Sequence, residues 1–547
     1  MTVWITRRDD DDVSAELAAA PSGPLAGVRL AVKDNVDVAG LPTTAACPEF
    51  AYLPQRDAAA VAALRAAGAV VVGKTNLDQF ATGLVGTRSP YGVVPDSRRP
   101  EYISGGSSSG SAVAVALGEA DIAVGTDTAG SGRVPAGLQG IAGIKPTVGV
   151  ISTDGVVPAC ESYDCVTIFA AGLAAANRAM AVLAAGAPNR RWPADTRLAA
   201  PPQPVIAVPR ELPELDQGWR SAFDAAVTAL SEAGARIVPI GIGPFLDAAK
   251  LLYGGALVSE RYAAVGGFID AHPGAALDPT VRGIIAAARD IAAHELVRDR
   301  REVERLRRVA MVALEGADAL MVPTSPMHPR ISEVAADPVG VNARLGTYTN
   351  FCNLFDMCAV AVPAGTAGHA QFGVTVLGRA FDDAVVLDVA ALIDGHAVAE
   401  VWPLGAASHA ELVVFGAHLR GGPLEDQLTG LGARFAGELT TAPRYRMSVL
   451  DTTPAKPAIT RCPDGVTGAA LTGHRWLLSP AALGTFLAAL PPPMQLGKVE
   501  FADGSWRTAF GCDGAAAAAG TDISGYGSWP AAVAAGAVAA GPGAVRG

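Results

Sequence analysis

Two serine-bearing segments carry the residue types that nucleophilic catalysis needs. The first is a glycine/serine run, residues 105–111. The second, residues 125–135, holds Ser131 among small side chains. The apolar stretch between them predicts a helix over 112–119, followed by a strand over 121–125. This helix would begin directly after the first serines, so its free N–H groups and positive dipole end would face them.

The small residues around Ser131 would let backbone N–H groups turn toward a reacting centre. An oxyanion hole made of backbone groups requires close approach and unusual dihedral angles, which small residues permit. We therefore expect N–H groups around Thr128, Ala129, Gly130 and Ser131 to stabilise the oxyanion that forms when a serine attacks a carbonyl.

A lysine is the base that this sequence offers to the serines. Residues 27–32 alternate as a strand and end in Lys33-Asp34-Asn35. A lysine that leaves an apolar strand can be partly buried, which lowers its pKa and lets it act as a base. Lys74 also follows an apolar strand, residues 70–73, so position alone does not choose between the two lysines. No histidine falls in the serine cluster, so a Ser–His–Asp triad has no local support.

These segments resemble the amidase signature family over roughly residues 23–400. The two serines are 24 residues apart, as the family motif requires. The resemblance implies that Ser131 is the nucleophile and that Ser107, in a cis peptide, bridges it to the base Lys33. It gives Lys74 a structural role. Arg133 is interpreted as an ion-pair residue that holds the nucleophile loop.

The order of patterns indicates an α/β protein. Helix and strand patterns alternate, which is typical of a sheet layered with helices. These segments are a helix over 57–69, a strand over 70–73, a helix capped by Thr75, a strand over 204–208, a helix over 217–235, a strand over 237–240, helices within 246–317, and strands over 359–365 and 373–377. The resemblance implies a mixed central sheet covered by helices on both faces.

Two domains are expected, 1–407 and 408–547, because the composition shifts at residues 405–409. Residues 1–25 are interpreted as a loose arm and 187–204 as a connection across the first domain. Short strand-like runs follow the boundary, at 437–440, 445–450 and 496–501. The last dozen or so residues are rich in alanine and glycine and are expected to fray.

Four features narrow the resemblance to the allophanate hydrolases. Gly132 stands where the wider family usually has a branched apolar residue, a serine run at 107–109 replaces Ser-Ser-Gly, and residues 157–165 follow the signature. Residues 415–421 are similar to the start of the C-terminal domain of these enzymes. The resemblance implies that 408–547 is a smaller α+β domain with a γ-glutamylcyclotransferase-like barrel.

This resemblance implies a substrate and its binding residues. Allophanate is a urea that bears a carboxylate, so its pocket needs a fixed cation. Tyr253 and Arg261, eight residues apart on one predicted helix, match the family's carboxylate-binding pair. Ammonia and carbon dioxide are the expected final products. The C-terminal domain would decarboxylate N-carboxycarbamate with His418 handling the proton, or it would serve only stability and dimerisation.

Other functions remain open on the sequence alone. The alternatives are a broad-specificity amidase, an amidotransferase A-like subunit, and a binding protein that kept the fold. No pattern typical of a metal or nucleotide site is present, so no metal and no cofactor are expected. The seven cysteines form no CxxC pair and are interpreted as buried free thiols.

Charge and hydropathy bear on partners and location. The net charge of -11 argues against nucleic acid and anionic membranes as partners. The same charge fits a cytoplasmic enzyme. The polar, acidic N-terminus is not typical of a signal peptide, and no apolar stretch qualifies as a membrane span. The family resemblance suggests a homodimer. No biotin-carrier region is found, so any urea carboxylase that supplies the substrate would be a separate chain.

Overall fold

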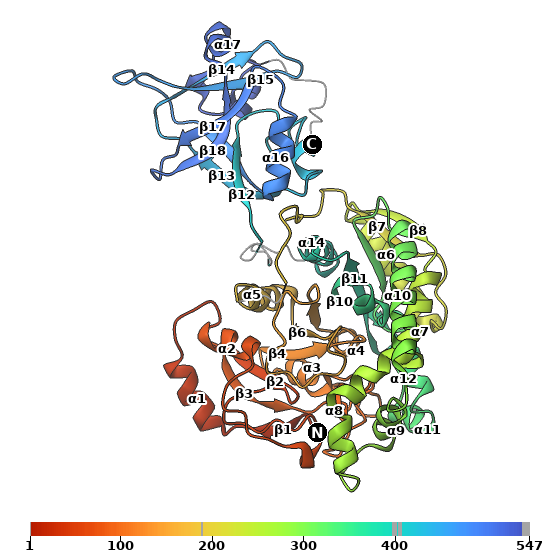
Figure 1. Ribbon diagram of the computed structural model, residues 1–547. Coiled ribbons are helices and arrows are strands. Elements are labelled where there is room, and N and C mark those ends of the chain that lie inside the picture. The colour runs from red at the N-terminus through yellow and green to blue at the C-terminus, as the bar shows by residue number, and fades with distance from the viewer. Residues whose placement is uncertain (1, 187–189, 396–401, 403–406, 539–547) are drawn as a thin grey trace. The chain divides into compact units, whose positions relative to one another are not determined.

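The computed structural model describes residues 2–186, 190–395, 402 and 407–538. The chain divides into two compact units. Unit 1 comprises residues 1–191 and 203–406, and unit 2 comprises 192–202 and 407–547. The segment 192–202 is therefore part of unit 2 although unit 1 flanks it in the sequence. Figure 1 shows the elements of both units.

Unit 1 is built on one mixed sheet of eleven strands. Their order is β1-β3-β2-β4-β6-β5-β10-β11-β9-β7-β8. β2 is parallel to β3 and β4, whereas β6, β10 and β11 pair antiparallel with their neighbours. The strands are β1 (Trp4–Arg7), β2 (Arg29–Lys33), β3 (Val70–Thr75), β4 (Ile122–Asp127), β5 (Ala142–Lys145), β6 (Cys165–Ala170), β7 (Val205–Pro209), β8 (Arg236–Ile240), β9 (Ala319–Pro323), β10 (Cys358–Ala367) and β11 (Ala370–Gly378).

Helices cover this sheet in two groups. α3 and α4 contact each other, and α6 and α14 contact each other; each group also packs on strands of the sheet. The helices are α1 (Asp10–Ala19), α2 (Ala59–Ala66), α3 (Ser109–Ala116), α4 (Val134–Gln139), α5 (Leu173–Ala184), α6 (Gln217–Glu232), α7 (Gly243–Gly254), α8 (Ser259–Ala271), α9 (Pro279–Ala287), α10 (Ala293–Ala313), α11 (Ile331–Ala336), α12 (Gly340–Leu345), α13 (Phe351–Leu354) and α14 (Asp383–Asp394). The predicted α/β class with a mixed, helix-covered sheet is confirmed.

The register of two parallel strands brings the chemistry together. β2 and β4 are neighbours, with Val32 paired to Val124, so both strands end at the same edge of the sheet. All six residues of β4 and four of the five in β2 are buried, which is typical of central parallel strands. Lys33 at the end of β2 therefore lies beside the loop that follows Asp127. Helix α3 begins at Ser109, three residues earlier than predicted, and this places the first serines at its N-terminus.

Two predictions about local structure are wrong. Residues 1–25 are not a loose arm, because β1 pairs antiparallel with β3 and α1 packs on β3. Thr75 does not cap a helix; it is the last residue of β3. Only a 3-10 turn, η2 (Gln79–Ala81), follows, and Phe80 inside it has a left-handed φ of 51°.

Unit 2 contains two sheets. Five strands lie in the order β13-β16-β12-β18-β17 and three in the order β15-β14-β19. The γ-glutamylcyclotransferase-like barrel stays a prediction. The elements are β12 (Ala410–Val414), α15 (Asp426–Thr429), β13 (Arg434–Thr440), β14 (Tyr445–Leu450), β15 (Lys456–Arg461), β16 (Thr472–Leu478), α16 (Pro480–Ala488), β17 (Met494–Glu500), β18 (Trp506–Cys512), α17 (Gly514–Ala519), β19 (Thr521–Asp522) and α18 (Trp529–Ala534). The expected fraying at the C-terminus falls mostly on 539–547, outside the described residues.

The segment 192–202 is tied to unit 2 by backbone contacts. The N–H of Leu198 donates to the carbonyl of Gly432 at 2.9 Å. Arg434 Nε returns a hydrogen bond to the Leu198 carbonyl at 2.7 Å. The N–H of Ala481 donates to the carbonyl of Ala194 at 3.0 Å. Of residues 187–204, which were predicted to be a connection across the first domain, 192–202 thus form part of unit 2.

Two further expectations concern the whole chain. All seven cysteines are free and buried, as predicted. Among the described residues, no helix combines the length and the apolar character that crossing a bilayer would need.

Candidate active site

Three side chains of unit 1 form one continuous chain of hydrogen bonds. Lys33 Nζ donates to Ser107 Oγ at 2.8 Å, and Ser107 Oγ donates to Ser131 Oγ at 2.9 Å. Lys33 and Ser107 are fully buried, and Ser131 is only 3% exposed. The peptide bond between Gly106 and Ser107 is cis. The structure therefore brings together the three residues predicted to be nucleophile, bridge and base.

Lys33 sits where its charged form is disfavoured. Burial lowers its pKa to about 7; Asp78, Asp164 and Asp127 oppose this shift, and the cation Arg261 adds to it. Its second hydrogen bond, to Thr126 Oγ1 at 2.7 Å, was not predicted. Thr126 lies in β4 near the register partner of Lys33, so the parallel pairing of the two strands was the signal that could have found it.

The loop after β4 has the properties of an oxyanion hole. Within the described part of the chain, the N–H groups of Thr128, Ala129, Gly130 and Ser131 donate no hydrogen bond. These residues are buried, so four unpaired donors are unusual there. Gly130 has a φ of +141°, and an added Cβ would lie 2.5 Å from Thr349 Oγ1, so neither the dihedral nor the space suits a larger residue.

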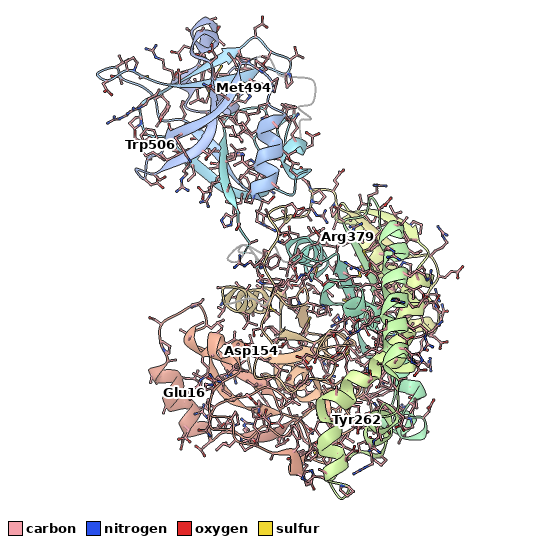
Figure 2. The ribbon with its side chains drawn as sticks, viewed as in Figure 1. Glu16, Asp154, Tyr262, Arg379, Met494 and Trp506 are labelled. Carbon is pink, nitrogen blue, oxygen red and sulfur yellow. The ribbon has the colours of Figure 1, made fainter. Side chains whose placement is uncertain are left out.

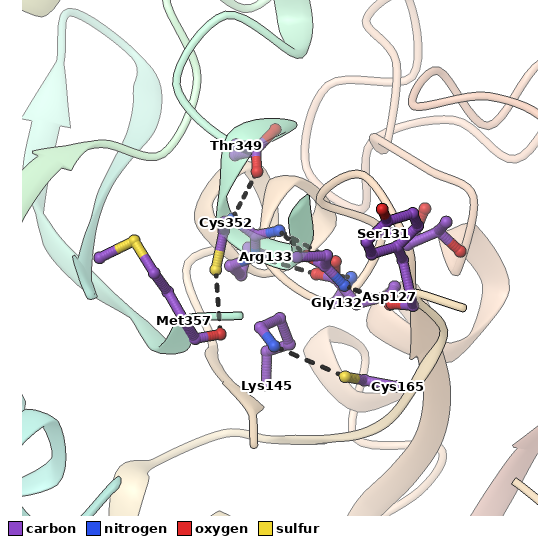
Figure 3. A network of polar contacts seen from close by, with 12 residues as sticks. Asp127, Ser131, Gly132, Arg133, Lys145, Cys165, Thr349, Cys352 and Met357 are labelled. Atoms are coloured by element: carbon purple, nitrogen blue, oxygen red, sulfur yellow. Dashed lines mark hydrogen bonds and ion pairs between the residues drawn. The ribbon is translucent and has the colours of Figure 1, made fainter. Parts of the chain in front are cut away.

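A buried ion pair holds this loop in place. The Arg133 guanidinium donates to both oxygens of Asp127, each at 2.9 Å, and also bonds the Thr349 carbonyl and Asn353 Oδ1. Asp127 Oδ2 also accepts from the N–H of Gly132 at 2.9 Å. Although burial opposes it, the Arg133 charge holds the pKa of Asp127 below its usual value. Figure 3 shows this network beside Ser131 and supports the predicted ion-pair role of Arg133.

The glycine at position 132, in place of the family's branched apolar residue, has a steric reason. A Cβ at this position would lie 2.6 Å from Thr167 Cγ2 and 2.8 Å from Thr167 Oγ1. Thr167, on the neighbouring strand β6, thus occupies the space that a branched side chain at position 132 would need. The glycine and the threonine form one packing unit behind the nucleophile.

The rival base, Lys74, is held elsewhere. Its ammonium group lies 3.3 Å from Asp34 Oδ1 and donates to Thr43 Oγ1 at 3.0 Å and to the Pro42 carbonyl at 3.2 Å. Asp34 in turn accepts a hydrogen bond from the Thr44 backbone N–H at 3.0 Å. None of these contacts involves a serine of the cluster, so the geometry favours Lys33 as the base.

Tyr253 and Arg261 meet, but not in the predicted way. Tyr253 lies in α7 and Arg261 in α8, separated by the short turn η3 (Ala256–Val258), so the expected single helix is wrong. Gly254 and Gly255 at the end of α7 break it. Arg261 Nη2 nevertheless donates to the Tyr253 hydroxyl at 3.1 Å, and the guanidinium lies 5.1 Å from the centre of the tyrosine ring.

Arg261 is buried and faces the site. It is 3% exposed, and its charge acts on the pKa values of Lys33 and Asp164. Its Nη1 donates to Thr82 Oγ1 at 3.0 Å and to the Ala81 carbonyl at 3.4 Å. Among the described residues, the hydrogen bonds that Arg261 makes all come from Nη1 and Nη2, and Nη2 bonds only Tyr253. Donors are therefore left for a ligand.

A second set of contacts joins α8 to the nucleophile loop. Glu260 accepts from the N–H of Ser162 at 3.0 Å and from Arg300 at 2.8 Å. Asp164, two residues after Ser162, accepts a hydrogen bond from the hydroxyl of Thr128 in the nucleophile loop. Burial raises the pKa of Asp164, and its hydrogen bonds oppose this. Tyr262, labelled in Figure 2, follows Arg261 but binds Asp270 and Arg289, so the two neighbours make separate contacts.

His418 lies in unit 2, after β12, and does not belong to the serine cluster. Its ring stacks on Phe510 with 5.1 Å between ring centres, and Nε2 pairs with Gln427 Oε1 at 2.9 Å. Burial lowers its pKa, Gln427 opposes this, and the charge of Lys456 lowers it further. Lys456 and His418 both line a cavity of about 10 Å³. That is about the smallest volume that holds one water molecule.

The arrangement in unit 1 suits acyl transfer. A buried neutral amine can take a proton through Ser107 from Ser131, and a loop of unpaired N–H groups lies beside the nucleophile. Within the described ranges, no group of three or more His, Cys, Asp and Glu side chains is placed to hold a metal ion.

Comparison with known proteins agrees with this chemistry. Residues 6–387 match the Amidase family, and residues 410–534 match the allophanate hydrolase C-terminal domain. The chain therefore belongs to the amidase family and is an amidohydrolase.

Individual relatives carry both parts of the chain. The chain is similar to Kluyveromyces lactis allophanate hydrolase, with a TM-score of 0.88, 37% identity, and coverage of 97% of this chain and 93% of the other. It is 40% identical to the urea amidolyase of Saccharomyces cerevisiae over 92% of its own length, but it spans only 29% of that protein. It is also 34% identical to the A-type subunit of the glutamyl-tRNA(Gln) amidotransferase of Symbiobacterium thermophilum, covering 67% of this chain and 82% of that one.

Proposed function

We propose that this chain hydrolyses allophanate by a Ser–cis-Ser–Lys mechanism. The observation that carries the proposal is the buried hydrogen-bond chain Lys33–Ser107–Ser131. This hydrogen-bond chain lies in unit 1 near Arg261, whose charge lowers the pKa of Lys33 and whose guanidinium has donors left over. Similarity to the Kluyveromyces lactis allophanate hydrolase, which covers both parts of the chain, supports the same substrate.

The first step is a proton transfer along the chain of hydroxyls. Neutral Lys33 accepts the proton of Ser107 while Ser107 accepts that of Ser131, so both hydrogen bonds reverse their direction. Ser131 Oγ then attacks the carbonyl carbon of the terminal amide. The N–H groups of residues 128–131 stabilise the negative charge on the carbonyl oxygen.

The second step releases products. The protonated Lys33 returns its proton through Ser107 to the leaving nitrogen, and ammonia departs from the acyl-enzyme. Water, deprotonated along the same route, then attacks the acyl carbon and releases N-carboxycarbamate. Lys33 is neutral again at the end of each half-reaction, so the same base serves both.

Arg261 supplies the fixed cation that the substrate carboxylate needs. Its Nε–H and one N–H of Nη2 remain available, and a planar guanidinium can bind a carboxylate in bidentate fashion. Tyr253 orients this guanidinium through its hydroxyl and its ring. A neutral amide would leave Arg261 buried without a counter-charge.

The testing experiment measures ammonia release by the purified chain from allophanate, acetamide, malonamate and glutamine. Ser131→Ala and Lys33→Ala should each lower allophanate turnover at least about 10³-fold. Lys74→Ala serves as the control for removing a buried lysine nearby, because its expected defect is in stability. Substantial turnover by folded Ser131→Ala or Lys33→Ala would exclude the mechanism.

The alternative function is that of a broad-specificity amidase or an amidotransferase A-like subunit. Similarity of unit 1 to the tRNA-dependent amidotransferase is the observation in its favour. A preference for acetamide or glutamine over allophanate would support it. Arg261→Lys should lower kcat/KM for allophanate about 10- to 100-fold through loss of the bidentate contact. Wild-type behaviour of that variant would remove the carboxylate-binding role.

For unit 2 we propose decarboxylation of N-carboxycarbamate, with His418 as the proton-handling residue. When Nε2–H donates to the side-chain amide oxygen of Gln427, Nδ1 of the neutral ring is left free to accept a proton. Lys456, which lines the same cavity, offers a cation to an anionic product. The cavity of about 10 Å³ is too small for this dianion, so binding requires movement of its lining.

His418→Ala tests this role without removing unit 2. Ammonia release from the first amide should stay unchanged, while release of carbon dioxide lags and N-carboxycarbamate accumulates. His409→Ala, a histidine outside this cavity, is the matched control. If carbon dioxide keeps pace with ammonia in His418→Ala, unit 2 serves stability or dimerisation instead.

We further propose a cytoplasmic homodimer whose substrate comes from a separate urea carboxylase. The similarity to a urea amidolyase, of which this chain spans 29%, supports the functional link to urea breakdown. Light scattering on the purified chain tests the dimer. A coupled assay, in which a urea carboxylase is added with urea, ATP and bicarbonate, tests the link.

A further inference from the structure

Residues 79–82 form a turn whose backbone is unusual for the side chains it carries. Phe80 and Ala81 have φ angles of 51° and 52°, in the left-handed region that favours glycine. Two consecutive residues in this region are strained, and such strain persists only where the surroundings impose it. No local pattern indicates this turn, because the segment has the composition of a helix start.

Buried contacts impose the conformation of the turn. The N–H of Phe80 donates to the Ala45 carbonyl at 2.9 Å, and Gln79 Nε2 donates to the Ala46 carbonyl at 2.8 Å. Beyond the turn, Arg88 Nη1 donates to the Thr82 carbonyl at 2.9 Å. Asn342 Oδ1 accepts from the N–H of Leu84 at 2.8 Å. The turn is therefore fixed at both ends by groups outside it.

The turn presents its polar atoms to Arg261. The Thr82 hydroxyl donates to the Phe80 carbonyl at 3.1 Å and accepts from Arg261 Nη1 at 3.0 Å. The Ala81 carbonyl lies 3.4 Å from the same nitrogen. Thr82 is fully buried. Because its single hydrogen is directed to Phe80, a lone pair is left for the arginine.

We propose that Thr82 is a positioning residue that fixes the guanidinium of Arg261 for an anionic substrate. The inference rests on the proposed carboxylate-binding role of Arg261. Thr82 holds Nη1 and Tyr253 holds Nη2, so two corners of a planar group are fixed and its plane is set. Nε and the second N–H of Nη2 then face the substrate without rotation on binding, which is how preorganisation raises affinity.

The experiment compares Thr82→Val, which keeps the shape and removes the hydroxyl, with Thr82→Ser, which keeps the hydroxyl. The probes are malonamate and malonamide, competitors of one skeleton of which only the first bears a carboxylate. Inhibition constants are measured from the carbon dioxide that allophanate turnover releases, because hydrolysis of either probe would give ammonia but no carbon dioxide. Thr82→Val should raise the inhibition constant of malonamate and the KM for allophanate about tenfold. The inhibition constant of malonamide should change less than about twofold. Thr82→Ser should retain most of the selectivity for malonamate.

A double-mutant cycle separates positioning from general damage. In an Arg261→Lys background, Thr82→Val should cause little further loss, because the group it positions is already absent. If Thr82→Val weakens the binding of both probes equally, or if the effects of the two substitutions are fully additive, the role of Thr82 is merely structural and the inference is overturned. If Thr82→Val does not fold, Thr82→Ala provides the same comparison.

The single variants distinguish an error about Thr82 from an error about Arg261. If Arg261→Lys leaves malonamate inhibition unchanged, the carboxylate-binding role itself is wrong. If Arg261→Lys weakens malonamate but Thr82→Val does not, Arg261 binds the carboxylate and Thr82 does not position it.

Discussion

Among single residues, Lys33 has the environment that decides the chemistry. Its side chain is fully buried, and both of its hydrogen-bond partners, Ser107 and Thr126, are uncharged hydroxyls. A buried ammonium without an adjacent carboxylate loses hydration that neutral partners do not replace. The amine can therefore be neutral near physiological pH, which a surface lysine cannot.

The pH profile should report this lysine. Since only the neutral amine accepts a proton, kcat/KM should rise with pH and level off above its pKa of about 7. Below that pH the rate should fall about tenfold per unit. Ammonia release across neutral pH, from mildly acidic to mildly alkaline buffers, measures it. A profile that is flat on both sides of neutrality would contradict the assignment.

Thr126 should tune the same profile. Its hydroxyl accepts a hydrogen bond from Lys33 Nζ and so stabilises the charged form. Thr126→Val removes that acceptor, so the midpoint of the profile should move to lower pH while kcat falls because the amine is less well oriented. Thr126→Ser, which keeps the hydroxyl, should leave the midpoint in place. A midpoint that rises in Thr126→Val would refute this interpretation.

At the next level, the loop from β4 to α4 works as a unit. Asp127 and Arg133 join its two ends, and the unpaired N–H groups lie between them. Removing one partner leaves a buried charge without compensation. Arg133→Met should therefore lower the free energy of unfolding by about 3–5 kcal/mol. Denaturant titration measures this, and Arg305→Met on the exposed face of α10 is the control.

A substitution of Gly130 tests the proposed oxyanion hole within this loop. Gly130→Ala meets both a positive φ and the Thr349 side chain, so the loop must shift and kcat should fall about 10²- to 10³-fold. Gly118→Ala is the matched control: that glycine also has a positive φ, of +70°, but nothing lies within 4 Å of its added Cβ. It should cost stability alone. Equal kcat losses in both variants would argue against an oxyanion role.

The proposed catalytic residues were more predictable than the elements that orient them. Ser107 and Ser131 stand in local glycine/serine motifs, but the roles of both serines and the choice of Lys33 over Lys74 came from the family resemblance, because both lysines follow an apolar strand. Tyr253 and Arg261 meet although the helix assumed to join them is broken. The left-handed turn at Phe80 was predicted to be helix, since its conformation comes from distant contacts that no local pattern encodes. Thr126 was missed because strand pairing depends on tertiary structure.

At the scale of the whole molecule, the chain passes between the two units more than once. Unit 2 contains residues 192–202, which lie in the sequence between α5 and β7 of unit 1. A truncation near residue 408 would remove the partners Gly432, Arg434 and Ala481 but leave this segment behind. Its effects on ammonia release would then mix loss of unit 2 with damage to unit 1, which is why single substitutions at His418 are the better test.

This arrangement predicts complementation. A fragment of residues 407–538 should be less stable alone than with a synthetic peptide of residues 192–202, because the peptide restores the backbone hydrogen bonds to Gly432 and Ala481. The Tm measured by thermal unfolding should rise as the peptide concentration increases. A peptide with Leu198 replaced by proline, which has no N–H to donate to Gly432, is the control. The idea fails if both peptides act alike.

The crossing segment also bears on how such a chain can change over generations. A domain appended at one end can be lost by a single stop codon and leave its neighbour intact. Here a stop codon near position 407 would leave residues 192–202 inside the remaining protein without Gly432 and Ala481, their hydrogen-bond partners in unit 2. Losing unit 2 cleanly would take a second, internal deletion in the same lineage. Descendants of this gene are therefore expected to keep both units or to lose the internal segment together with the second unit.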